Sequence, residues 1–205
     1  MSMSRYTPQQ LIGQFRAIVG PLTDEEFFRR PRHKKTQELW CAAHYSLGFE
    51  KFIAPCTVQV SEVDEQTDTD FVLQCATECF PFQITEVIEP GRRRGELVRN
   101  GQPLVVPIDE NPKGTTEGSS WVRAAIQRKV LKHYADACQL NLLCYINFSA
   151  RNQQFEIVRA ACNDVSASFA SVWLLTGNAL CCIHPVIPEL SGWLVIPETM
   201  AHVDE

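Results

Sequence analysis

Two short β-type segments constrain this chain most: DFVLQCA at residues 70–76 and PFQITEVI at residues 81–88. In each, apolar residues alternate with polar ones, the pattern of a strand with one buried face. Only residues 77–80 separate them, so we expect neighbouring strands with Cys79-Phe80 or adjacent residues in the turn. Residues 52–63 alternate in the same way. The sequence therefore predicts an antiparallel meander of three strands.

Helical patterns lie on both sides of the meander. Thr7-Pro8 suits a cap and first helical residue, and QQLIGQFRAIVG follows. A short helix is expected from Thr23, and a third, TQELWCAAHYSLG, is expected to end at Gly48. After an irregular stretch at 90–120, Ser119-Ser120 can cap WVRAAIQRKVLKHYADAC, whose apolar residues recur every four positions through Cys138.

Two continuous apolar runs, NLLCYINF and SVWLLTG, are typical of buried strands, and the helical pattern QFEIVRAACNDV lies between them. A strand-helix-strand alternation after a meander predicts an α/β fold with a central mixed β-sheet flanked by helices. We expect a helical N-terminal extension over residues 1–34 and the α/β domain over residues 35–205.

Composition narrows the class of protein. With 205 residues, 45% hydrophobic and 21% charged, the chain is typical of a globular protein without a membrane span, and we expect it in the cytoplasm. Nine cysteines, an odd number, favour reduced thiols in the core, among them Cys41, Cys75, Cys138 and Cys144. A net charge of −5 argues against coating nucleic acid, but local basic clusters permit a basic cleft.

Polar residues interrupt the predicted strands. Asp70 opens the first, and Gln83 and Thr85 share one face of the second. If the two strands pair as a hairpin, Asp70 and Gln83 or Thr85 converge on one side. Glu38 lies near the start of the third predicted helix.

This order of acids and elements resembles the PD-(D/E)XK nuclease superfamily, whose core is restriction-endonuclease-like, αβββαβ. The stretch QELWCAAHYSLGF is similar to the first helix of the Holliday-junction resolvases in that superfamily, with Glu38, Gly48 and Phe49 at the matching positions. The resemblance covers roughly residues 35–150.

The resemblance implies a metal-dependent endonuclease that hydrolyses phosphodiester bonds of DNA. Glu38, Asp70 and Gln83 would then bind Mg²⁺ or Mn²⁺, and Lys129 would polarise water or phosphate. The nucleic-acid-binding residues would be basic: Arg92, Arg93, Arg94, Arg128 and Lys132. Many such folds form homodimers to cut both strands, and here the Trp193 segment, expected to be exposed, could serve as the interface.

One position departs from the family pattern. The family's lysine stands two residues after the acid, where this chain has Thr85. Lys129, or Lys113 in the irregular stretch, could supply the missing charge. The alternative is a catalytically inactive nuclease-like fold that acts as a nucleic-acid- or protein-binding regulatory module.

Structural interpretations of the same residues stay open. Asp70 could be a turn residue, Glu38 a surface residue, and Gln83 with Thr85 the solvated face of an edge strand. Glu86, on the opposite face, could pair with the arginine triplet. Two spacings hint at a zinc site: Cys75 with Cys79, and Cys181-Cys182 with His184. The best candidate for a cysteine nucleophile is Cys182, because His184 is near it in the sequence.

Overall fold

The structure is a computed structural model, and it describes residues 4–21, 34–60, 69–92, 112–134, 136–148, 155–190 and 192–196. Its helices are α1 (Pro8–Val19), α3 (Lys34–Phe52), α5 (Pro112–Val130) and α6 (Phe155–Ser166), with short 3₁₀ helices η3 (Ala137–Gln139) and η4 (Pro188–Leu190). Its strands are β1 (Arg5–Tyr6), β2 (Thr57–Val60), β3 (Phe71–Cys75), β4 (Glu78–Val87), β5 (Asn141–Ile146), β6 (Ser171–Leu175), β7 (Ala179–His184) and β8 (Leu194–Val195).

The eight strands form one mixed sheet in the order of the chain, from β1 to β8. Strands β1 to β4 are antiparallel, β4 to β6 are parallel, and β6 to β8 are antiparallel again. Each parallel pair is joined through a helix, α5 between β4 and β5 and α6 between β5 and β6. The predicted α/β class with a mixed sheet, a meander and crossover units is confirmed.

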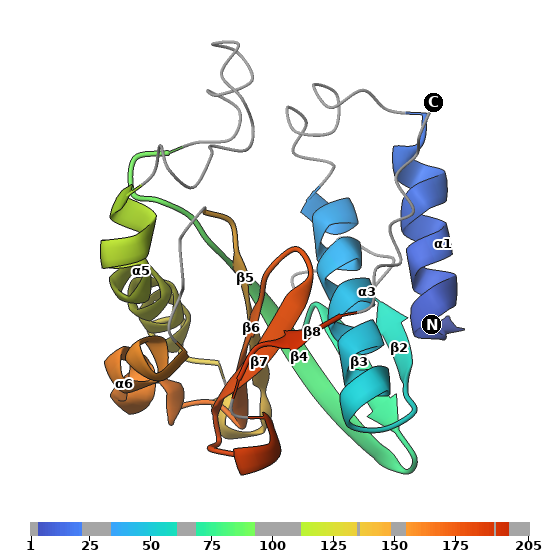
Figure 1. The fold of residues 1–205 in the computed structure, drawn as a ribbon. Helices are drawn as coiled ribbons and strands as arrows, with labels where there is room; N and C mark the ends of the chain where they lie inside the picture. Colours follow the sequence, from blue (N-terminus) through green and yellow to red (C-terminus); the bar gives the residue numbers. More distant parts are fainter. Residues whose placement is uncertain are drawn as a thin grey trace.

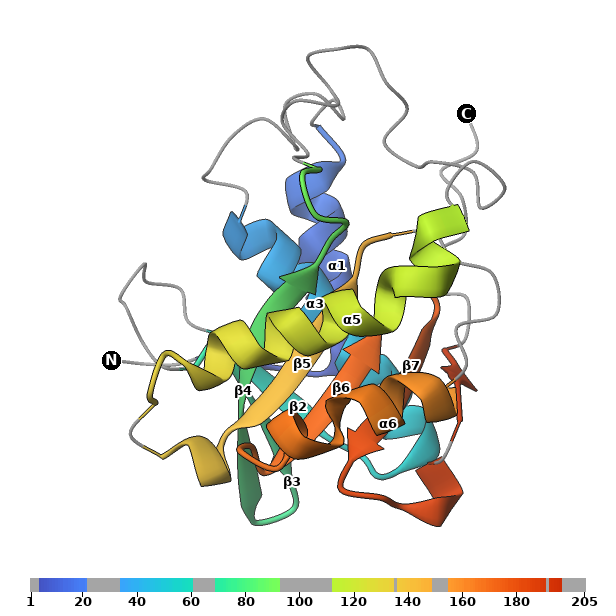
Figure 2. The same cartoon turned by 90° about the vertical axis from the view of Figure 1, so that its left-hand side faces the viewer.

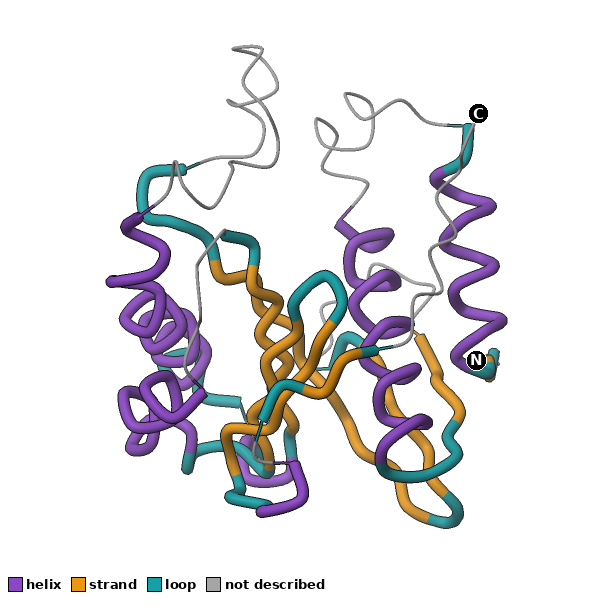
Figure 3. Tube along the Cα trace, viewed as in Figure 1, coloured by secondary structure: helices purple, strands orange, loops and turns teal. Residues whose placement is uncertain are grey.

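Helices cover both faces of the sheet (Figures 1 and 3). One face packs on α3, with α1 outside it, and the other packs on α5 and α6, which cross the sheet in Figure 2. Each layer has its own buried cluster, the first around Tyr45 and Phe82 and the second around Trp121 and Leu142. The segment predicted as an N-terminal extension contributes β1 to the sheet and α1 to the α3 layer.

Helix α1 begins as its sequence predicts. The Thr7 hydroxyl accepts from the Gln10 amide, and the Gln10 side chain accepts from the Thr7 amide, a reciprocal capping box before Pro8. Two backbone donors that a helix start leaves without partners are thereby satisfied. The helix expected from Thr23 lies outside the described residues.

The expected end of α3 at Gly48 is wrong, because the helix continues to Phe52. A Cβ atom at Gly48 would lie 2.0 Å from Leu180 Cδ2 on β7 and 3.2 Å from Ile196 Cγ1. Gly48 therefore allows α3 to approach the sheet closely, and its role is packing and not helix termination.

The bounds expected for α5 are wrong at both ends. The helix begins at Pro112, a favoured first position, and not at Ser119-Ser120. It ends at Val130, followed by a turn in which His133 has a positive φ of 52°. Because the helix stops there, its apolar stripe does not reach Cys138, which is exposed and not in the core.

Smaller expectations on the strands and cysteines are also corrected. The β3–β4 turn lies at Ala76-Thr77 and not at Cys79-Phe80, which belong to β4. Cys41 and Cys144 are buried as expected, and Cys75 is partly buried. All nine cysteines are free thiols. Over the described ranges, no helix combines the length and apolar character needed to cross a bilayer.

Candidate active site

Asp70 lies directly before β3, where β3 and β4 stop pairing. The last paired residues at this end are Phe71 and Phe82. The Asp70 amide donates to Phe82 O at 2.8 Å, and its Oδ2 accepts from the Ile84 amide of β4 at 2.7 Å. The carboxylate thus accepts a hydrogen bond from a backbone amide of β4 beyond the region where β3 and β4 pair. This bond fixes the position of the Asp70 side chain.

Glu38 lies one turn into α3, beside the same end of β3. Its Oε1 is 3.2 Å from Lys34 Nζ and its Oε2 is 3.5 Å from Lys35 Nζ. The Lys35 contact is an ion pair without hydrogen-bond geometry, so Oε2 is buried with no hydrogen-bond partner in the structure. A buried carboxylate oxygen in that state is unfavourable unless it binds something further.

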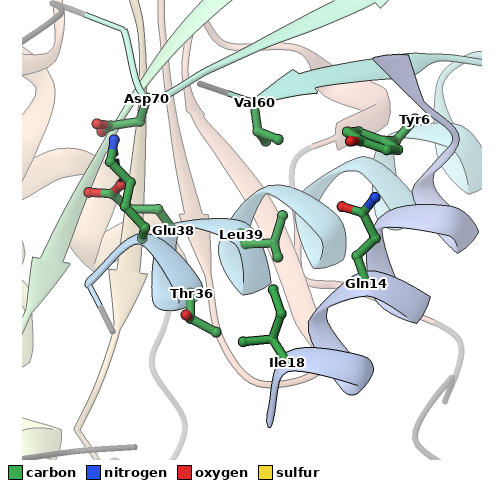
Figure 4. A pocket seen from close by; sticks show the side chains of 9 residues that line it. Tyr6, Gln14, Ile18, Thr36, Glu38, Leu39, Val60 and Asp70 are labelled. Carbon is green, nitrogen blue, oxygen red and sulfur yellow. Dashed lines mark ion pairs between the residues drawn. The ribbon is translucent and has the colours of Figure 1, made fainter. Parts of the chain in front are cut away.

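Glu38 and Asp70 line one pocket of about 260 Å³. Figure 4 shows the side chains of Glu38 and Asp70 at the same end of this pocket. Glu38 belongs to α3 and Asp70 precedes β3, and the two residues are 32 positions apart in the chain.

Gln83 lies on β4, is 5% exposed, and turns its amide toward α5. Lys129 Nζ donates to Gln83 Oε1 at 2.6 Å, and the Tyr134 hydroxyl donates to the same oxygen at 3.3 Å. The short distance to the ammonium is typical of a charge-assisted hydrogen bond. Gln83 is therefore a buried acceptor that holds Lys129 and is not on the solvated face of an edge strand.

Lys129 is partly buried, and its pKa is lowered to about 8. The largest cause is burial, which disfavours the charged ammonium. The negative charge of Asp70 acts in the opposite direction and raises the pKa, while the positive charges of Lys132 and Lys34 lower it. These interactions link Lys129 to Asp70 and to Lys34 at the start of α3.

We call Glu38, Asp70, Gln83 and Lys129 the polar cluster. Four separate elements supply it: α3, the residue before β3, β4 and α5. It combines two carboxylates with one ammonium of lowered pKa, at the point where two strands separate.

Two carboxylates with a buried, unsatisfied oxygen fit a hard divalent cation. Mg²⁺ binds through one or two carboxylates and keeps several waters. Over the described part of the chain, no group of three or more His, Cys, Asp or Glu side chains could hold a metal. Glu38 and Asp70 would therefore hold the ion, since Gln83 Oε1 already accepts from Lys129 and Tyr134.

Some of the basic residues predicted from the sequence lie near the polar cluster, and others lie far from it or outside the described residues. Lys132 is exposed beyond the end of α5 and acts on Lys129 electrostatically, and Arg128 is exposed in the last turn of α5. Arg92 lies in a turn after β4, and Arg93 and Arg94 lie outside the described residues. Lys113 is in the first turn of α5, about 24 Å along the helix from Lys129, so it is remote from the cluster.

Sequence reasoning misses three neighbours of the cluster. Lys34 and Lys35 belong to a basic run in the sequence, yet their spacing from Glu38, four and three positions, places them on its helix face. Tyr134 fits the helical stripe by its spacing, but it follows the left-handed His133 and reaches Gln83 from outside the helix. No local signal in the sequence marks that turn.

The remaining candidate residues make structural contacts. Cys182 donates to His184 O and Pro185 O, and burial raises its pKa to about 12, so it is a poor nucleophile. Glu86 accepts from Asn147 Nδ2 at 2.7 Å. Trp193 is only partly exposed and packs against the α5–α6 side core.

The chain matches no protein-family model, no curated protein and no solved structure. The case for a function therefore depends on the geometry of the polar cluster.

Proposed function

We propose that the polar cluster is the active site of a metal-dependent endonuclease of the PD-(D/E)XK type that acts on DNA. The observation that carries the proposal is the meeting of Glu38 and Asp70 with a partly buried lysine at the separation of β3 and β4. The order α3-β2-β3-β4-α5-β5 is the order expected for that core.

Glu38 and Asp70 would hold Mg²⁺, which when bound neutralises phosphate charge and favours ionisation of water. Asp70 is kept in position by its bond from the Ile84 amide. Glu38 Oε2 has no hydrogen-bond partner and lies 3.5 Å from Lys35 Nζ, so the ion would take the place of that ammonium.

Lys129 would place positive charge beside the phosphate, the task of the lysine that Thr85 replaces. Gln83 Oε1 orients it by accepting from the ammonium, and the Tyr134 hydroxyl donates to the same oxygen. In its protonated form the ammonium stabilises the negative charge that develops on the phosphoryl oxygens. A pKa of about 8 leaves most of it protonated at neutral pH.

Nicking of supercoiled plasmid tests this function. In Mg²⁺ or Mn²⁺ the wild type should nick, and EDTA should stop it. Asp70→Asn keeps an acceptor for Ile84 but removes the charge, so its rate should fall at least about 100-fold, a loss of about 2.7 kcal/mol of transition-state stabilisation. Glu78→Gln, an exposed acid in the same hairpin, is the control and should nick normally.

A second candidate is a binding module without hydrolysis. It is favoured because Gln83 Oε1 already accepts hydrogen bonds from Lys129 and Tyr134. Only the two carboxylates of the polar cluster then remain as metal ligands. If wild type and Asp70→Asn are equally inactive across metals and substrates, yet both bind DNA in a salt-sensitive way, this candidate replaces the nuclease.

A further inference from the structure

The pocket beside the polar cluster extends well past the two carboxylates. It runs between α1, α3 and the strands β1 and β2, with Glu38 and Asp70 at one end and Tyr6 and Gln14 at the other (Figure 4). Ile18, Leu39 and Val60 lie between these ends. Metal chemistry at the carboxylates makes no use of this apolar part.

The lining suits a planar heterocycle. Tyr6 lines it with an aromatic ring, Gln14 with an amide that can donate and accept, and the three aliphatic side chains with apolar surface. A cavity of about 150 Å³ is enough for benzene. The pocket of about 260 Å³ has room for a nucleobase.

The position of the pocket relates it to the proposed chemistry. In a nucleotide the base is joined to its phosphate through one sugar, so a base in this pocket would bring a phosphate near the carboxylates. A base stacked inside a duplex cannot enter such a pocket, whereas an unpaired or flipped base can. Lys35 lines the same pocket and offers a cation to the backbone.

We propose that this pocket binds one unpaired base of a DNA strand whose adjacent phosphate lies at the polar cluster. The substrate class is then single-stranded or locally unpaired DNA. This inference rests on the proposed DNA substrate, but it can be tested apart from hydrolysis.

The test compares two ten-nucleotide strands labelled with fluorescein, one of thymidines and one of abasic tetrahydrofuran units. Binding to the full chain is followed by anisotropy in Ca²⁺, and gels verify that the strands stay intact. The wild type should bind the thymidine strand about tenfold more tightly than the abasic one, because the pocket contacts the base.

The key variant is Ile18→Trp, which fills the pocket from α1. Ile18 is 44% exposed, so the larger side chain should not prevent folding. The preference for thymidine should fall to about twofold or less, the loss of one stacking contact. Ile157→Trp is the matched control on α6, where Ile157 is 54% exposed on the opposite layer, and it should keep the wild-type preference.

The outcomes separate the two proposals. Equal binding of both strands by the wild type, or an unchanged preference in Ile18→Trp, overturns the base pocket even if plasmid is nicked. A preference that Ile18→Trp removes supports the pocket even if plasmid is never nicked, and then only the nuclease proposal fails. Failure to bind either strand overturns the base pocket, and plasmid nicking alone then decides the nuclease proposal.

Discussion

The side chain of Lys129 shows how burial and charge act on a single residue. Removal from water disfavours its ammonium, and Lys132 and Lys34 add repulsion, while Asp70 and the Gln83 oxygen favour the charged form. Burial dominates, so the pKa of Lys129 is about 8 instead of its usual value near 10.4. The folded protein therefore holds this proton less tightly than the unfolded chain does.

This difference predicts a pH dependence of stability. Above pH 8 the folded state releases the Lys129 proton while the unfolded state retains it until about pH 10.4, so the free energy of unfolding gains up to about 1.4 kcal/mol per pH unit from this group. We expect wild type to gain stability relative to Lys129→Met between pH 8 and 9.5. Urea unfolding of both proteins measures the difference, in which the shared titration of buried thiols cancels.

Below pH 8 both states keep the proton, so the difference between wild type and Lys129→Met should be constant there. A difference that stays constant from pH 7 to pH 9.5 would show that the pKa of Lys129 is not lowered.

The sequence predicts some positions in the polar cluster and not their partners. Asp70 is predictable because an acid opens an alternating strand, and Lys129 because helical periodicity places it at the edge of an apolar stripe. Gln83 is expected from the sequence as a metal ligand, but its oxygen accepts from Lys129 and Tyr134. These hydrogen bonds depend on the distance between the end of α5 and β4. That distance is a feature of the tertiary structure and cannot be predicted from sequence periodicity.

At the scale of elements, α3 depends on a glycine for its distance from the sheet. The helix is buried on nearly all sides, since α1 covers the face that the sheet does not. A small residue at Gly48 lets Leu180 pack directly against the helix backbone. In the sequence a glycine near a helix end indicates termination, and only the position of β7 reveals the packing role.

We predict that Gly48→Ala destabilises the protein by up to about 2 kcal/mol. Alanine favours the helix by about 1 kcal/mol, but overpacking against a fully buried leucine costs about 1–3 kcal/mol, and at 2.0 Å the clash should prevail. Gly13→Ala in α1 is the matched control, because nothing lies within 4 Å of its added Cβ. It should stabilise by up to about 1 kcal/mol. Thermal and urea unfolding measure both, and a stabilised Gly48→Ala would contradict the packing role.

At the scale of the whole molecule, net charge and local charge differ in sign. The chain carries −5 overall, yet Lys34, Lys35, Lys129 and Lys132 gather around two carboxylates beside the start of β3. Opposed signs of this kind would steer a polyanion to one place on an otherwise acidic body. The order of elements from α3 to β6 was predictable from periodicity, whereas the short edge strands β1 and β8 were not. The local field arises because the starts of α3 and β3 lie near the end of α5.

The salt dependence of DNA binding measures that field. Each lysine that contacts a phosphate of a single strand adds about 0.7 to the slope of log K against log salt concentration. Lys34→Gln with Lys132→Gln should therefore reduce the slope by about 1.4 for a ten-thymidine strand. Lys51→Gln is the control, since Lys51 lies in the last turn of α3, about 25 Å along the helix from Lys34, and should leave the slope unchanged. Equal slopes for the double variant and Lys51→Gln would mean that DNA, if bound, lies elsewhere on the surface.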